Sequence, residues 1–137
     1  MQPRISYLVG RLDRVVRRRL ADALRPHELS LQEYTTLSVL RARAGLSNAQ
    51  LARRSLVTPQ AMNEVLARLE QRGLVLRDPG RTRGRIRPAE LTASGKRLLA
   101  AADRSVDAVE RELFAGADGN GLRELLVATL RSTADSQ

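Results

Sequence analysis

Two stretches of the sequence carry side chains suited to recognising a nucleic acid. Residues 58–64 read TPQAMNE. Glutamine and asparagine amides can each make two hydrogen bonds to an adenine edge, and threonine and alanine can contact a thymine methyl. Residues 78–88 read DPGRTRGRIRP and place four arginines within eleven residues. Arginine is drawn to the negative potential of a narrow minor groove. Together the two stretches predict non-covalent reading of bases and phosphates.

The residues expected to contact DNA fall into three groups. Five lie at the amino-terminal end of a predicted helix, which would face base edges; the first of them, Thr58, can cap the helix and also lie near the DNA backbone. A sixth lies one turn later and is better placed for a phosphate. Three more lie in the basic loop and are expected to enter the minor groove. The group at the start of the helix is Thr58, Gln60, Ala61, Asn63 and Glu64, the residue one turn later is Arg68, and the loop residues are Arg81, Arg83 and Arg85.

Other charged side chains are interpreted as surface groups. Arg53, Arg54 and Arg72 are expected to be exposed, with at most a phosphate contact, and Arg77 and Arg87 to follow phosphates or face water. The carboxylates of Asp103 and Asp107 lie at helical spacing and are interpreted as solvated charges.

Composition limits the class of protein. The 137 residues carry a net charge of +9, which predicts a polyanionic partner, either nucleic acid or an acidic membrane surface. No apolar run approaches the ~20 residues that span a bilayer, and the amino-terminal residues lack the apolar segment of a signal peptide. We therefore expect a cytoplasmic protein without a membrane partner.

The sequence gives no sign of enzymatic or cofactor chemistry. It has no cysteine and a single histidine, His27, so neither a thiolate site nor a histidine cluster can form. It contains no phosphate-binding loop and no nucleophile–base pair. We expect no catalysis, no metal and no cofactor.

Start and stop signals divide the chain into helices and a hairpin. Ser30 with Glu33, and Ser47 with Gln50, form capping boxes, and Thr58 precedes Pro59 at a helix start. Apolar periodicity completes the helices. We predict helices over 4–25, 31–43, 48–54, 59–72, 93–115 and 122–134, and short strands over 74–77 and 86–91.

This order is that of a mainly α winged helix-turn-helix, in which the helix over 59–72 enters the major groove and the basic hairpin is the wing. We interpret 1–137 as one domain, with a DNA-binding lobe over 30–91 flanked by dimerisation helices over 1–26 and 92–137. The flanking apolar stripes exceed what a small winged helix needs, which predicts a two-fold dimer. Such a dimer would bind half-sites about one helical turn apart in a pseudo-palindromic duplex.

The sequence resembles the MarR family of bacterial transcription regulators. The resemblance rests on SLQEYTTLSVL (30–40), LSNAQLARRSLVTPQAMNEVLARLEQRGLV (46–75) and ELTASGKRLL (90–99). It implies an obligate dimer, repression or less often activation of nearby genes, and frequently release by a small phenolic or anionic ligand. It assigns 58, 60, 61, 63 and 64 to the recognition helix and Arg85 to the wing. The wing departs from the family's D-R-R pattern, because Arg83-Gly84-Arg85 contains no acid.

Two alternatives use the same features. A non-specific architectural protein would use the charge and the wing without reading bases, and a helical protein-interaction module would use the flanking helices alone. No ligand-binding residue is assigned, since Tyr34 is expected in the core and a lone loop histidine is more often incidental.

Overall fold

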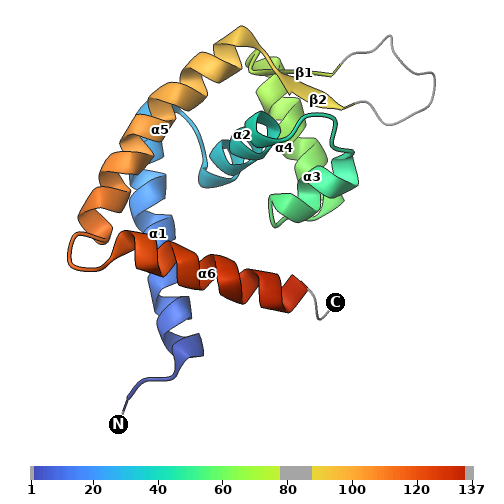
Figure 1. Ribbon diagram of the computed structural model, residues 1–137. Helices are drawn as coiled ribbons and strands as arrows, with labels where there is room; N and C mark the ends of the chain where they lie inside the picture. Colours follow the sequence, from blue (N-terminus) through green and yellow to red (C-terminus); the bar gives the residue numbers. More distant parts are fainter. Residues whose placement is uncertain (1, 78–87, 135–137) are drawn as a thin grey trace.

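The computed structural model describes residues 2–77 and 88–134 (Figure 1). The predicted fold class is confirmed: helices dominate and one small antiparallel sheet follows the third and fourth of them. In chain order the elements are α1 (Ile5–Leu24), a 3₁₀ turn η1 (Arg25–His27), α2 (Leu31–Ala42), α3 (Asn48–Arg54), α4 (Pro59–Gln71), β1 (Val75–Arg77), β2 (Ala89–Leu91), α5 (Ala93–Leu113) and α6 (Gly119–Ala134).

Both predicted capping boxes form. The Oγ of Ser30 accepts a hydrogen bond from the Glu33 amide at 3.0 Å, and the Glu33 carboxylate accepts one from the Ser30 amide at 2.9 Å. Ser47 and Gln50 make the same exchange at the start of α3. These bonds satisfy amides that the first turn of a helix leaves without a partner, and they fix where α2 and α3 begin.

Two predicted boundaries differ from the structure. Helix α6 begins at Gly119 and not at residue 122, because the Asp118 carboxylate accepts the Gly121 amide at 3.0 Å and starts the helix earlier. Within the described residues the second strand covers only Ala89–Leu91, so Pro88 precedes the strand and does not interrupt it.

The core lies between α2, α3, α4 and α5, beneath the sheet. Its most deeply buried side chains are Leu24, Leu37, Leu51, Met62, Val65, Leu66, Leu69 and Leu99. Strands β1 and β2 pair Val75 with Leu91 and Arg77 with Ala89, which places Val75 and Ala89 on the buried face. This core holds the helix-turn-helix and the base of the wing as one body.

Helices α1 and α5 run side by side away from that body, and α6 follows them in the chain (Figure 1). Only Leu24 of α1 is fully buried, whereas Ile5, Leu8, Val9, Leu12 and Val15 are exposed, as are Leu125, Leu126, Val127 and Leu130 of α6. Among the helices within 2–77 and 88–134, none is both long and apolar enough to cross a bilayer.

A close backbone approach joins α5 to the wing. A Cβ built on Gly95 would lie 2.1 Å from the carbonyl oxygen of Leu74. The adjacent Thr92 donates its hydroxyl to the Gly73 carbonyl at 2.6 Å and its amide to the Leu74 carbonyl at 3.1 Å. Only glycine fits between the start of α5 and the strand, so Gly95 sets the spacing of these two elements.

We expect Gly95→Ala to lower the free energy of unfolding by about 1–3 kcal/mol, because the methyl group must push the rigid carbonyl away. Urea unfolding at a fixed protein concentration measures this loss. Ser94→Ala, at the neighbouring exposed position, serves as the control and should change stability by less than about 0.5 kcal/mol. Equal effects of the two substitutions would show that the approach is not tight in solution.

Candidate nucleic-acid interface

Burial fixes the rotation of α4 about its own axis. Met62, Val65, Leu66 and Leu69 are at most 1% exposed and hold one side of the helix against the core. The opposite side is in solvent and carries the polar residues predicted to contact DNA. Those exposed residues are Gln60, Asn63, Glu64 and Arg68.

The amino-terminal end of α4 is formed by Thr58 and Pro59. The Thr58 Oγ1 accepts a hydrogen bond from the Ala61 amide at 3.1 Å. Pro59 occupies the first turn of the helix, where a backbone amide has no carbonyl partner, so its missing amide proton costs no hydrogen bond. The hydroxyl proton of Thr58 is not used in this bond and can be donated to a phosphate. Thr58 is exposed and Ala61 is half-buried, so the methyl of Ala61 offers less surface than its neighbours.

The Asn63 amide is held by a residue that sequence reasoning missed. Asn48, the first residue of α3, donates its side-chain amide to the Asn63 Oδ1. The second lone pair of Oδ1 and both Nδ2 protons of Asn63 remain available for a base edge. Asn48 therefore orients the side chain most suited to adenine. Its position after a capping serine was visible in the sequence, but its contact with a residue 15 positions away was not.

Positive charge surrounds this surface. Arg68 is exposed one turn beyond Glu64, and Arg53 and Arg54 are exposed at the end of α3, as expected. The Arg77 side chain behaves differently, since its Nε pairs with the Glu70 carboxylate at 2.9 Å. Its charge is thus partly neutralised within the protein. Four arginines of the wing lie outside the described residues: Arg81, Arg83, Arg85 and Arg87. The position at which the family's wing carries an acid lies outside them as well.

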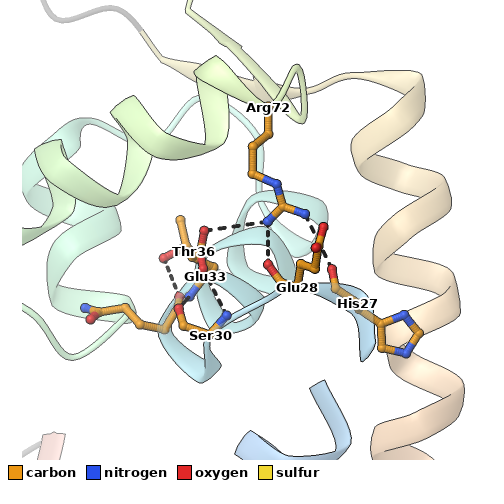
Figure 2. A network of polar contacts seen from close by, with 7 residues as sticks. His27, Glu28, Ser30, Glu33, Thr36 and Arg72 are labelled. Carbon is orange, nitrogen blue, oxygen red and sulfur yellow. Dashed lines mark hydrogen bonds and ion pairs between the residues drawn. The ribbon is translucent and has the colours of Figure 1, made fainter. Parts of the chain in front are cut away.

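Arg72 is exposed, as expected, but its guanidinium also makes contacts that the sequence did not predict. This residue caps the carboxyl end of α4 and donates to the Glu28 carbonyl at 2.6 Å and to the His27 carbonyl at 3.4 Å (Figure 2). Its guanidinium also lies 3.9 Å from the buried carboxylate of Glu33, which in turn caps α2 at Ser30. Arg72 therefore ties the recognition helix to the loop before α2.

The loop before α2 also contacts α5. The His27 ring, interpreted as incidental from the sequence, shares a 2.9 Å hydrogen bond with the Ser105 hydroxyl on α5 (Figure 2 shows the ring beside that helix). A chain of contacts thus runs from Arg72 through residues 27 and 28 to the middle of α5.

Asp103 is not a solvated charge. Tyr34 donates its hydroxyl to the Asp103 carboxylate at 2.6 Å, and Arg41 donates to the other carboxylate oxygen. Burial opposes ionisation of Asp103, but the hydrogen bonds from Arg41 and Tyr34 outweigh it and lower the pKa of Asp103. Burial, the hydrogen bond and the charge of Asp103 together raise the pKa of Tyr34 to about 12. Helix α2 is thereby fastened to α5 at two side chains.

The same residues do not form a metal site. No group of three or more histidine, aspartate or glutamate side chains gathers within the described ranges 2–77 and 88–134 in a way that could hold an ion. The polar groups brought together here are suited to hydrogen bonding and charge pairing.

A helix-turn-helix with an exposed polar recognition face, followed by a two-stranded wing, defines a winged helix DNA-binding protein. The MarR family model matches residues 27–86. The HTH-type transcriptional repressor Rv2887 of Mycobacterium tuberculosis is 42% identical over 111 residues, which are 81% of this chain and 80% of that protein. The chain therefore belongs to the MarR family and is a DNA-binding transcriptional regulator.

Solved structures of that relative match nearly the whole chain. The crystal structure of Rv2887 in complex with DNA is 36% identical with a TM-score of 0.77, covering 95% of this chain and 98% of that one. The complex of Rv2887 with salicylic acid is 38% identical with a TM-score of 0.75, covering 95% and 96%.

We expect Asp103→Asn to lower the pKa of Tyr34 from about 12 towards about 10, because it removes the negative charge and weakens the hydrogen bond that favours the neutral phenol. Ultraviolet titration in a Tyr7→Phe background follows Tyr34 alone, since the chain has two tyrosines. Asp107→Asn, an exposed carboxylate one turn later on α5, is the control. An unaltered Tyr34 pKa in Asp103→Asn would show that the contact does not persist in solution.

The same variant has a defined effect on stability. Because the pKa of Asp103 is lowered on folding, its ionised form stabilises the fold above the unfolded pKa of about 4, and this contribution disappears as the pH falls through the lower folded value. The difference in stability between the natural protein and Asp103→Asn should therefore be full at pH 7 and shrink in acid.

Proposed function

We propose that this chain is a homodimeric repressor that reads a pseudo-palindromic operator. The exposed polar face of α4, fixed by the burial of its opposite face, is the observation that carries the proposal. On this proposal, residues 30–91 are the DNA-binding lobe and the remaining helices form the dimer. The protein acts in the cytoplasm and performs no catalysis.

The flanking helices support association with a second copy. A cavity of about 780 Å³ lies between α1, α5 and α6, lined by Leu12, Val16, Phe114, Leu126 and Val127 among others. Exposed apolar side chains on α1 and α6 continue this surface. A large apolar patch in contact with water is unfavourable, and a two-fold dimer would bury it while placing two copies of α4 on one side of a duplex.

Each predicted contact residue receives a role in this proposal. Gln60 and Asn63 read base edges, Glu64 accepts a hydrogen bond from a cytosine amine, and Thr58 and Arg68 bind phosphate. Ala61 offers its half-buried methyl to a thymine. The roles of Arg81, Arg83 and Arg85 in the minor groove rest on the sequence.

A small anionic aromatic molecule is proposed to release the protein from DNA. Structures of Rv2887 exist with salicylic acid, with p-aminosalicylic acid and with DNA. Helix α5 contacts the DNA-binding lobe through its buried Leu99 and Ala102 and through Gly95, Asp103 and Ser105, and these contacts would together set the angle between the lobe and α5. A ligand that favours another angle would move the two recognition helices out of register with their half-sites.

The function is tested by selecting duplexes from a fragmented genomic pool and titrating the protein against a selected duplex and a scrambled duplex at one salt concentration. We expect a dimer by solution mass and a preference of about 10³-fold or more for the selected duplex. Added salicylate should weaken this binding. A ratio near one would favour the architectural alternative, and failure to bind any duplex at low salt would favour a protein-interaction module.

Two substitutions separate base reading from phosphate binding. Asn63→Ala should cost about 1–3 kcal/mol at one base pair of each half-site and relax the sequence preference there. Arg68→Ala should weaken binding to all sequences alike and reduce the slope of log affinity against log salt by about one unit per contact. Arg104→Ala, which removes an exposed charge from α5, is the matched control. The same uniform loss from both α4 variants would refute the assigned roles.

A further inference from the structure

Leu56 has an unusual backbone conformation. It follows the end of α3 with φ at +61°, in the left-handed region that leucine seldom adopts. The position closes α3: the Leu56 amide donates to the Arg53 carbonyl at 3.2 Å, and the Val57 amide donates to the Ala52 carbonyl at 3.0 Å. Glycine is the usual residue at such a position; Gly45, Gly73 and also Glu28 have a positive φ elsewhere among the described residues.

The side chain of Leu56 contributes nothing to the core. It is 81% exposed, whereas its neighbours Ser55 and Val57 are buried and partly buried. A large apolar group in solvent is unfavourable when it has no partner, and here it also occupies a strained backbone position. Folding alone would be better served by glycine or asparagine. Neither the core nor the backbone conformation accounts for a leucine at this position.

Leu56 lies beside the proposed reading surface. It is two residues from Thr58, the cap of α4, so at most about 7 Å of chain separates them. Arg53 and Arg54, which precede it on α3, are both exposed. An apolar side chain among cations, next to a helix that enters the major groove, suits a duplex, whose grooves combine phosphate charge with the C–H surface of thymine methyls and deoxyribose.

We propose that Leu56 is an apolar DNA-contact residue that contributes to operator affinity. Its left-handed conformation holds the isobutyl group at the surface, where it contacts either a thymine methyl or sugar carbons at the edge of each half-site. The inference rests on the proposed function and adds a contact that the polar face of α4 does not supply.

The test compares Leu56→Gly, Leu56→Asn and Leu56→Met with the natural protein on one selected duplex. Leu56→Gly relieves the strain, so its thermal unfolding midpoint should equal or exceed that of the natural protein. Its affinity for the duplex should nevertheless fall about tenfold, since two apolar contacts are lost per dimer. Leu56→Asn should behave alike, and Leu56→Met should retain more affinity than either.

The salt dependence gives a second readout. Because no charge is removed, the slope of log affinity against log salt should match that of the natural protein while the affinity falls. Replacing thymidine by deoxyuridine in the duplex then distinguishes the two surfaces. If Leu56 contacts a thymine methyl, the replacement lowers the affinity of the natural protein but causes no further loss of affinity in Leu56→Gly. If Leu56 contacts sugar carbons, the replacement changes the affinity of both proteins by the same factor. Either result supports the proposal.

Two results would overturn it. Affinity within about twofold of the natural protein for both Leu56→Gly and Leu56→Asn would exclude a DNA contact. Unchanged affinity combined with lost repression in a purified transcription reaction would assign Leu56 to a protein partner instead. Failure of the proposed function itself would be recognised separately, because the natural protein would then select no duplex.

Discussion

The burial of one side of α4 is the constraint on which the rest of the structure depends. Met62, Val65, Leu66 and Leu69 each gain about 2 kcal/mol from leaving water, so turning the helix by even one residue would expose much of that surface. The opposite side of α4 does not pack against the core, and its polar residues therefore face solvent. The exposure of the polar face of α4 therefore follows from apolar packing, to which the Thr58 cap and the contacts of Arg72 add.

In the proposed dimer, position along the DNA would depend on a different set of contacts. The proposed dimer would present two copies of α4, and their separation would be set by how each proposed DNA-binding lobe is attached to α5. That attachment combines the buried side chains of Leu99 and Ala102 with the carbonyl approach at Gly95, the carboxylate of Asp103 and the hydroxyl of Ser105. Hydrogen bonds are directional, so the polar contacts add a preferred orientation to the close packing of the apolar ones.

The local features of the fold could be predicted from sequence, and the contacts between elements could not. Capping serines, an N1 proline and apolar periodicity act within one helical turn, so Ser30, Ser47 and Thr58 located their helices correctly. The partners of Arg72 lie 44 and 45 residues away, and Asp103 lies 69 residues from Tyr34. Without the fold, such side chains are indistinguishable from surface charges. The exposure of the polar face of α4 was predictable because that face is the complement of a periodic apolar stripe.

The exposure of helix α6 gives a physical reason why DNA binding and dimerisation should be coupled. Its residues 123–133 are exposed in the single chain, and a sixteen-residue helix with so little tertiary contact is only marginally stable in water. Its leucines need a partner surface, and in the proposed dimer the second copy provides one. In that dimer, three events would occur together in one coupled equilibrium: the ordering of α6, the burial of the cavity between α1, α5 and α6, and the pairing of the two copies of α4. Operator occupancy would consequently rise more steeply than in proportion to protein concentration below the dimer dissociation constant, because each binding event requires two chains.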